Sequence, residues 1–144
     1  MRKFERCKGF ENVVLPRRST KKSAGYDFTL NHDVFVPAGK ESEKIVTGIK
    51  ACMNDDEFLG LHIRSSIGIK MEVIIANIQG IIDADYYNNP DNEGNIMIIL
   101  RNLGNKDATL HKGDRVVQGI FQKYLLTDDD DSDDMRKGGL GSSN

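Results

Sequence analysis

The sequence of 144 residues has no Trp, only two Cys, three Pro and few aromatic residues. Two thiols are too few for a disulfide framework, and Cys7 and Cys52 lack the C-x-x-C spacing of a zinc or redox site. The three His are scattered and form no metal-binding pattern such as H-E-x-x-H. These absences exclude a disulfide-rich secreted scaffold and chemistry on a transition metal held by protein ligands.

Long apolar runs are also missing. The run from Ile96 to Leu100 is far shorter than the roughly 20 residues that cross a bilayer. The charged start, Met1 to Glu5, lacks the apolar core of a signal peptide. We therefore expect a cytoplasmic protein without a membrane partner, or a nuclear one if the source is eukaryotic.

The net charge of -2 hides an uneven distribution of charged residues. Six of the 22 acidic residues are aspartates between positions 128 and 134. Without these six, and without Arg136 and Lys137, the first 126 residues hold 18 basic and 16 acidic side chains. No basic stripe interleaved with aromatic residues is present, and the Asp run would repel phosphate, so we expect no nucleic-acid partner.

The pattern of apolar residues is typical of an all-β protein. Short runs rich in Val, Ile, Phe and Tyr alternate with clusters of Gly, Pro, Asn and Asp, whereas helical periodicity is weak. We predict strands near 24–29, 34–37, 43–50, 57–63, 72–76, 79–83, 95–102 and 114–124, which suit a small barrel or jelly roll. The segment Ser65 to Met71 is predicted to form one short helix, capped by serine hydroxyls, whose free N–H groups would favour an anion.

We divide the chain into a β domain, residues 1–126, an acidic linker, 127–135, and a Gly-rich arm, 136–144. The aspartates of the linker repel one another and the linker has no apolar surface to bury, so it should be extended and solvated. The arm is too rich in Gly to fold alone, which leaves two alternatives: a frayed terminus, or a segment that orders on a ligand. Nine extended linker residues would carry the arm about 30 Å, far enough to reach a neighbouring subunit.

Five short segments carry residues suited to chemistry. They are Ser23 to Phe28, Arg64 to Gly68, Asn77 to Tyr86, Gly113 to Gln118, and the Gly-rich tail. Each has a structural alternative, because Asp27 beside a Gly is typical of a turn, Arg64 with two serines of a surface cluster, and Asp83 of a strand end. Taken together, their order and spacing favour a shared function.

In this order the segments resemble the five motifs of the homotrimeric dUTP diphosphatase (dUTPase) family, from about Ser19 to the end of the chain. The specific elements are Gly80-Ile81-Ile82-Asp83-Ala84-Asp85-Tyr86 and Arg64-Ser65-Ser66-x-Gly68. The resemblance implies a distorted jelly-roll barrel of the β-clip type with one short helix and a flexible C-terminal arm. It also implies a homotrimer with active sites at subunit interfaces. Such an enzyme hydrolyses dUTP to dUMP and pyrophosphate, which limits uracil in DNA and supplies dUMP for thymidylate synthesis.

For the triphosphate, the resemblance assigns Arg64, Ser65, Ser66, Gln118 and Arg136. Their chemistry agrees, because a guanidinium fork matches phosphate oxygens, and hydroxyl and N–H groups at a helix start add short hydrogen bonds. The resemblance further implies that Asp83 is the catalytic base, which deprotonates the water that attacks the α-phosphorus. A carboxylate is already ionised at pH 7 and needs no large pKa shift for this role.

The family uses Mg²⁺ held largely by substrate phosphates and water. The resemblance makes Asp27 a catalytic residue that accepts a hydrogen bond from a metal-bound water, in the outer shell of the ion. Mg²⁺ commonly keeps several waters and takes few protein ligands, so no carboxylate cage is required. An Asp in a Gly-Tyr-Asp turn also has a purely structural alternative.

For the uracil and deoxyribose, the resemblance assigns Asn77, Gly80, Ile82 and Tyr86. A hairpin main chain would pair with the uracil edge, so cytosine would leave buried polar groups unpaired and the methyl of thymine would clash. The Tyr86 ring would pack where a ribose 2′-hydroxyl would lie, which would exclude UTP. Its alternative is a strand aromatic residue in the core.

Three features depart from the family pattern. Leu140 stands in the tail where the family usually has an aromatic residue that stacks on uracil, and Tyr87 is our hypothesis for its substitute. Arg136 is followed by one residue fewer than in many members before the lid, which comprises Gly138, Gly139, Leu140, Gly141 and Ser142. The stretch from Tyr87 to Glu93 is an extended loop.

Two other functions are open at this point. A dCTP deaminase of the same fold would need a catalytic Glu on the strand after the third motif, where Asn95 to Leu100 offers no carboxylate. A binding module that senses nucleotide or sequesters a partner would not need the full set of Asp27, Arg64, Ser65, Asp83 and Gln118. We therefore expect retained catalysis, with a regulatory protein partner left open as an additional role.

Overall fold

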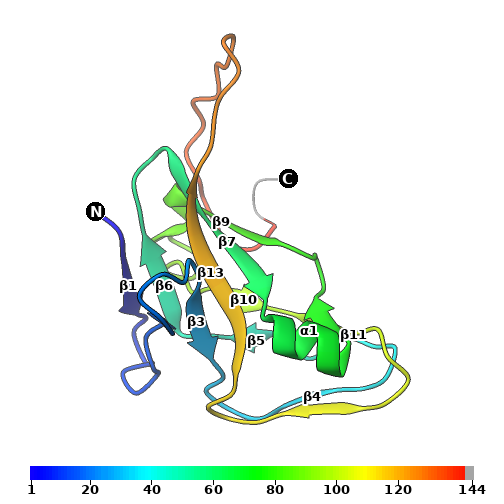
Figure 1. Ribbon diagram of the computed structural model, residues 1–144. Coiled ribbons are helices and arrows are strands. Elements are labelled where there is room, and N and C mark those ends of the chain that lie inside the picture. The colour runs from blue at the N-terminus through cyan, green and yellow to red at the C-terminus, as the bar shows by residue number, and fades with distance from the viewer. Residues whose placement is uncertain (142–144) are drawn as a thin grey trace.

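The computed structural model describes residues 1–141 and consists mainly of short antiparallel strands (Figure 1). Its largest sheet has five strands in the order β2 (Arg17–Arg18), β3 (Tyr26–Thr29), β13 (Arg115–Lys123), β7 (Glu57–Ile63) and β9 (Gly80–Asp83). Four further antiparallel pairs are β1 (Lys3–Arg6) with β6 (Ile49–Cys52), β4 (Val34–Val36) with β12 (Ala108–Leu110), β5 (Ile45–Val46) with β10 (Met97–Ile98), and β8 (Val73–Ile75) with β11 (Leu100–Asn102).

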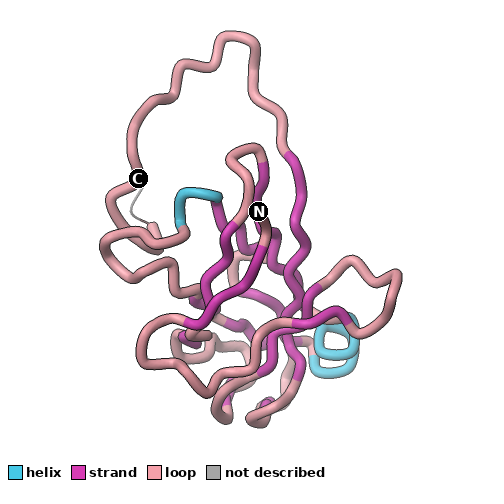
Figure 2. Tube along the Cα trace, turned by 90° about the vertical axis from the view of Figure 1, so that its left-hand side faces the viewer, coloured by secondary structure: helices cyan, strands magenta, loops and turns pink. Residues whose placement is uncertain are grey.

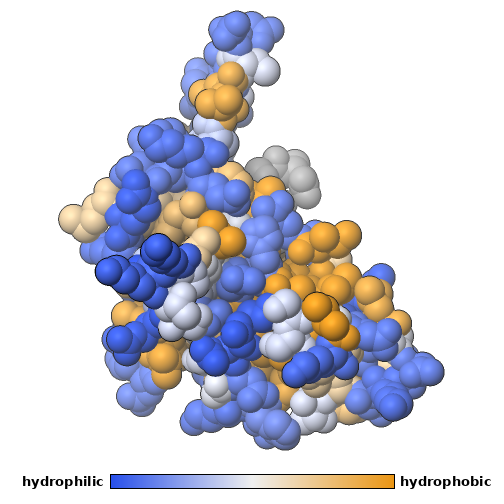
Figure 3. Space-filling model, viewed as in Figure 1, coloured by the Kyte–Doolittle hydropathy of each residue, from blue (hydrophilic) through white to orange (hydrophobic). Residues whose placement is uncertain are grey.

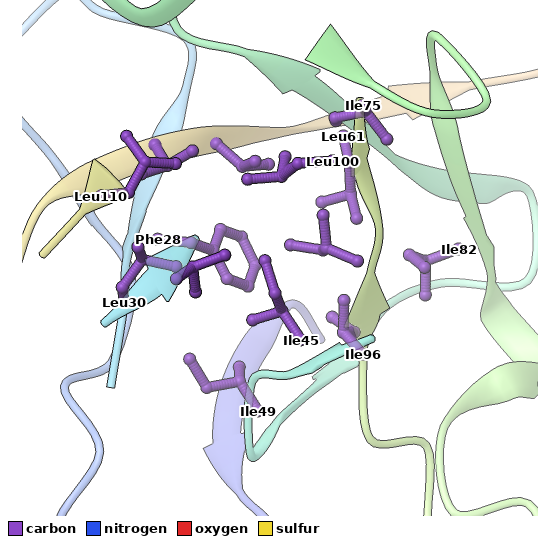
Figure 4. Close-up of a cluster of buried hydrophobic side chains, with 14 of the residues drawn as sticks. Phe28, Leu30, Ile45, Ile49, Leu61, Ile75, Ile82, Ile96, Leu100 and Leu110 are labelled. Carbon is purple, nitrogen blue, oxygen red and sulfur yellow. The ribbon is translucent and has the colours of Figure 1, made fainter. Parts of the chain in front are cut away.

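The strands surround one hydrophobic core (Figure 4). Side chains alternate between core and solvent, as a pleated strand requires. In β4, Val34 and Val36 are buried while Phe35 is exposed. In β9, the same alternation buries Ile82 and turns Asp83 outward. The core therefore determines which face of β9 can carry polar chemistry.

Antiparallel pairs around one core, with one short α-helix, confirm the predicted all-β, jelly-roll-like architecture. Among residues 1–141 the sheets do not close into a continuous barrel, so the fold is more open than the barrel we expected. In the same part of the chain, no helix has the length and apolar character that a membrane crossing would demand.

Most predicted strands are present, and the differences have physical reasons. The predicted strand 43–50 is divided into β5 and β6 because Gly48, at φ 73°, turns the chain between them. The predicted strand 95–102 is likewise divided into β10 and β11. The sequence pattern predicts no strand at β1, β2 or β12, because these runs of two to four residues contain no Val, Ile or Tyr.

The helix α1 (Ser65–Met71) has the bounds that the sequence predicts. It directly follows β7, and Glu72, in the left-handed conformation at φ 55°, ends it. The prediction that serine hydroxyls cap this helix is wrong, because Arg64 occupies the N-cap position and no side chain makes a capping bond. Ser65 and Ser66 are instead its first two residues, whose N–H groups have no partner within the helix.

Beyond β13 the chain leaves the β domain in a long excursion and then returns (Figures 1 and 2). Residues 122–135 are exposed throughout, whereas Gly138 and Gly139 are buried. The acidic linker therefore projects into solvent, while the Gly-rich arm lies against the β domain. Ser142 of the predicted lid lies outside the described residues.

Candidate functional site

Asp27 lies at the centre of a group of polar side chains on the five-stranded sheet. Its side chain is only 8% exposed, and Arg64 Nε lies 3.1 Å from Oδ1. Arg115 Nη1 lies 3.5 Å from the second oxygen, Oδ2. Gln118 is directly opposite Asp27 in the ladder between β3 and β13. We call Asp27, Arg64, Arg115 and Gln118 the arginine cluster.

Backbone contacts hold the arginine cluster in place. The Arg64 N–H donates to the Val116 carbonyl at 2.9 Å, and Arg64 Nη1 donates to the Arg115 carbonyl at 3.3 Å. The register of β13 against β3 shifts after Arg115, an irregularity of the kind that re-aims a side chain. A Cβ at Gly25 would lie 2.1 Å from Gln118 Oε1, so glycine leaves the space that this amide occupies.

The arginine cluster carries one net positive charge, because two guanidinium groups share one carboxylate. The side chains of Arg64 and Arg115 are 27% and 50% exposed, so both retain donors that face solvent. Ser65 and Ser66 begin α1 beside Arg64 and add N–H groups and hydroxyls. This arrangement suits an anion with several oxygen atoms, such as a polyphosphate.

A second set of predicted residues lines a cavity of about 230 Å³ along β9. The lining includes Asn77, Gly80, Ile82 and, from the arm, Leu140. Ile78, in the turn before β9, has φ 68°, a strained conformation for a β-branched residue. The strained turn and the arm therefore meet at one cavity.

At the end of β9, Arg136 of the arm binds two carboxylates. Its Nη2 lies 2.7 Å from Asp83 Oδ2, and its Nε lies 2.7 Å from Asp85 Oδ1. The guanidinium also lies 5.7 Å from the centre of the Tyr86 ring. The hydrogen bond to Asp85, with the charges of both carboxylates, raises the pKa of Arg136. We call Asp83, Asp85 and Arg136 the carboxylate cluster.

The two clusters are far apart within one chain. Asp83 pairs with Phe58 in the ladder between β7 and β9, whereas Arg64 follows the other end of β7. Phe58, which lies opposite Asp83, and Arg64 are six residues apart along an extended strand. At about 3.3 Å per residue, this places Asp83 and Arg64 about 20 Å apart. The predicted site residues therefore form two separate sets, and one chain does not bring Asp83 to Arg64.

Tyr86 is buried beside the carboxylate cluster, in the 3₁₀ turn Ala84–Tyr86. Its hydroxyl donates to the Asn95 carbonyl at 2.9 Å and accepts from Asn92 Nδ2 at 2.8 Å. Burial raises the pKa of this hydroxyl. The ring is therefore held in one orientation with its hydroxyl protonated.

Tyr87 does not line the cavity along β9. Its hydroxyl donates to Glu5 of β1, a bond that raises the pKa of Tyr87, and its ring lies 5.2 Å from Lys50 Nζ. Within one chain this geometry does not support the hypothesis that Tyr87 supplies the missing stacking ring. The arm residue at the cavity is Leu140.

The chain is similar to known proteins over nearly its whole length. The family model described as dUTPase matches residues 11–144. The deoxyuridine 5'-triphosphate nucleotidohydrolase of Lactococcus lactis subsp. lactis is 41% identical, over 99% of this chain and 97% of that protein. The chain belongs to the dUTPase family.

Solved dUTPase structures share the fold. The dUTPase from Streptococcus mutans matches with a TM-score of 0.77 at 39% identity, over 87% of this chain and 98% of that one. A dUTPase of Staphylococcus bacteriophage 80alpha, solved with dUpNHpp, matches with a TM-score of 0.73 at 16% identity, over 95% of this chain and 99% of that one. The open arrangement of short sheets is thus a dUTPase fold.

Family membership sets the enzyme class. The dUTPase family hydrolyses dUTP to dUMP, so the chain is an enzyme of the dUTP diphosphatase type. Its members are generally trimeric and generally use Mg²⁺. Among residues 1–141, no group of three or more His, Cys, Asp or Glu is arranged to hold a metal ion. Each Asp27 oxygen faces one guanidinium and retains a second lone-pair position, so Asp27 fits a contact to a metal ion through water.

Four residues that lie at these sites have no role predicted from the sequence: Asp85, which binds Arg136 Nε, together with Arg115, Asp91 and Asn92. Arg115 lies in the fourth segment. The sequence feature that could have indicated it is its position as a second basic residue near the predicted phosphate ligands. Asp91 and Asn92 are in the extended loop that departs from the family pattern. Their contacts to the arm and to Tyr86 depend on how the loop folds, which residue types alone do not give.

Proposed function

We propose that this chain hydrolyses dUTP to dUMP and pyrophosphate at sites shared between the subunits of a homotrimer. The distance of about 20 Å between the arginine cluster and the carboxylate cluster supports this proposal. The arginine cluster offers positive charges that would bind phosphates, and the carboxylate cluster offers a carboxylate that would accept a proton from water. A second chain would bring these two halves of the chemistry together.

Exposed apolar side chains supply a surface for such an assembly. Apolar residues gather on the side of the molecule that carries α1 and β9 (Figure 3). Three exposed isoleucines belong to this surface. Ile69 lies in α1 and is 79% exposed, Ile78 lies in the turn before β9 and is 77% exposed, and Ile81 lies in β9 and is 58% exposed. A group of exposed apolar residues on separate elements is typical of a protein contact. We propose that neighbouring subunits cover this surface.

In the proposed reaction, Asp83 accepts a proton from a water molecule while the water oxygen attacks the α-phosphorus. The bond from the α-phosphorus to its bridging oxygen breaks, and pyrophosphate leaves with the electron pair. Arg64, Ser65, Ser66 and Gln118 hold the triphosphate so that attack is in line. Asp27 would hold a water molecule of a bound Mg²⁺ ion, which would supply positive charge to offset that of the phosphates.

Arg136 connects substrate binding with activation of the water molecule. Its pairing with Asp83 occupies Oδ2 of the proposed base, so the departure of Arg136 would open that oxygen to a water molecule. The substrate phosphates are the competing partner, because a guanidinium binds phosphate and carboxylate oxygens through the same fork. Substrate binding would thereby free the base.

In this proposal, selectivity for the base comes from the cavity along β9. Main-chain groups between Asn77 and Ile82 would pair with the uracil edge, since backbone donors and acceptors discriminate bases when water is excluded. The fixed Tyr86 ring would occupy the space of a ribose 2′-hydroxyl. The enzyme would then limit uracil in DNA and supply dUMP for thymidylate synthesis.

A pyrophosphate-release assay with dUTP, UTP, dTTP and dCTP, each with and without Mg²⁺, tests the activity. We expect rapid release from dUTP alone, with Mg²⁺ increasing the rate. Comparable release from UTP would contradict the role of Tyr86. Release of ammonia from dCTP would favour a deaminase instead.

Mixed trimers test the shared site. Trimers of Arg64→Ala chains alone, or of Asp83→Asn chains alone, should be inactive. After the two kinds of chain are refolded together in equal amounts, roughly a quarter of the sites should combine an intact Arg64 with an intact Asp83 from another chain. Sedimentation of the mixture should give one trimeric species. No recovery of dUTP hydrolysis in such trimers would show that both residues must belong to the same chain.

A further inference from the structure

The extended loop after Tyr86 is tied into one shape by its own side chains. Asn89 is buried, and its Nδ2 donates to the Tyr86 carbonyl at 2.8 Å and to Asn92 Oδ1 at 2.7 Å. Its Oδ1 accepts from the backbone N–H groups of Asp91 and Asn92, at 3.0 and 3.1 Å. We call residues 87–95 the asparagine loop. Its shape does not depend on contacts with the arm.

Within this loop the side-chain amide of Asn92 is held on both sides. Its Nδ2 donates to the Tyr86 hydroxyl at 2.8 Å. Its Oδ1 accepts from Asn89 Nδ2 and from the Gly94 N–H, at 2.7 and 3.0 Å. Turning the amide would break all three hydrogen bonds, so Asn92 presents a fixed surface.

The arm lies directly on this fixed surface. The Gly139 N–H donates to Asp91 Oδ2 at 3.2 Å, and Gly139 is buried. A Cβ at Gly139 would lie 2.6 Å from Asn92 Nδ2 and 3.1 Å from Asp91 Oδ2. The first distance is too short for a carbon atom, and the amide would have to break its three hydrogen bonds to move away. Glycine at this position is therefore required by space.

We infer that Asn92 is a positioning residue that seats Gly139 of the arm and links this seat to the hydroxyl of Tyr86. The asparagine loop is then the docking surface of the arm, and arm closure is coupled to the ring beside the sugar. The significance of this coupling rests on the proposed function, in which the arm is a lid and Tyr86 contacts deoxyribose. The contact itself does not depend on catalysis.

Hydrogen exchange of the full-length protein, followed by mass spectrometry of the C-terminal peptide, tests the inference. Gly139→Ala should speed exchange in the arm about fivefold or more, because its Cβ displaces the arm from Asn92 and breaks the bond to Asp91. Exchange within residues 87–95 should stay at the wild-type rate. Arm exchange at the wild-type rate in Gly139→Ala would overturn the inference.

Controls separate docking from a general loss of structure. Lys137→Ala removes an exposed side chain from the same arm, and Asn105→Ala removes an exposed amide from a distant loop, so neither should change arm exchange. Asn92→Ala should speed it, and the double variant with Gly139→Ala should exchange no faster than Gly139→Ala alone, because the loss of Asn92 Nδ2 also removes the atom with which the new Cβ clashes. Additive effects of the two substitutions would contradict a direct seat.

Tyr86→Phe tests the link between the seat and the ring. This change keeps the ring but removes the acceptor that orients Asn92 Nδ2, so arm exchange should rise by a smaller factor than in Gly139→Ala. An unchanged rate would overturn the link to Tyr86. If the wild-type protein failed to hydrolyse dUTP, the proposed function would fall, whereas these exchange results would still decide the docking contact.

Discussion

The arginine cluster and the carboxylate cluster have opposite compositions. In the first, two Arg share one Asp, and in the second, one Arg binds two Asp, so their net charges are opposite. The first is assembled by strand register between β3 and β13 and by the end of β7. The second depends on an arm that returns after an exposed linker. The arginine cluster is therefore preorganised by the sheet, whereas the carboxylate cluster changes when one segment moves.

The largest effect should follow from a change in the carboxylate cluster. Asp83→Asn should lower kcat about 10² to 10⁴-fold with a smaller change in KM, because it removes the proton acceptor. Steady-state hydrolysis of dUTP measures both constants. Asp85→Asn is the matched control, since it also weakens the hold on Arg136 but leaves the base. Equal losses in the two variants would reassign the role of Asp83.

Removal of the arm should have the next largest effect. A chain that ends at Leu126 should keep the arginine cluster and the folded β domain, because neither uses the arm. Its kcat/KM for dUTP should fall roughly 10²-fold, since orientation by a closing segment contributes effects of this size. Circular dichroism and sedimentation would report the fold. An unchanged kcat/KM would show that the carboxylate cluster works without Arg136.

A change at the centre of the arginine cluster should act on binding and stability together. Asp27→Asn removes the anion that orients both guanidinium groups, so KM should rise about tenfold through their lost positioning, and the free energy of unfolding should fall by about 1–3 kcal/mol. Enzyme kinetics and urea denaturation measure these changes. Asp56→Asn removes an exposed carboxylate paired with Lys123 and should alter neither. Loss of kcat alone in Asp27→Asn would place Asp27 in the chemical step.

The smallest effect concerns the pH dependence of the asparagine loop. The hydrogen bond from Lys50, with that from the Lys8 N–H, holds the pKa of Glu93 below its ordinary value. Glu93 therefore contributes stability above the unfolded-state pKa of about 4.3, and this contribution is lost as pH falls through the lower folded-state pKa. Thermal melts should show Glu93→Gln below wild type at neutral pH. The gap should close in acid, and a gap independent of pH would contradict this role.

Much of the fold could be predicted because its signals are local. The turn residues around α1 and the apolar runs of β7 and β13 lie within single segments, so their bounds follow from the sequence. β12 could not be predicted, because its sequence, ATL, lacks the valines and phenylalanine of β4, the equally short strand with which it pairs. Gly48 similarly divides a predicted strand, since a glycine within a strand pattern permits a turn without requiring one.

Residue types predict the members of the candidate site better than their partners. Arg64, Asp27 and Asp83 stand out because guanidinium and carboxylate groups suit phosphate hydrolysis. The pairing of Arg136 with Asp83 depends on the path of the arm, and the position of Arg115 depends on an irregular register in β13. These are long-range properties, which no single segment contains.

The exposed linker makes the arm a tethered ligand for its own protein. A flexible tether of this length keeps its end at an effective concentration in the millimolar range, about what a weak contact needs for partial occupancy. The hydrogen bond from Gly139 to Asp91 and the ion pairs of Arg136 with Asp83 and Asp85 are contacts of that kind. Repulsion among the aspartates stretches the tether, and added salt would screen it and shorten the mean span. The number of aspartates would thus set how often the arm is seated at a given ionic strength.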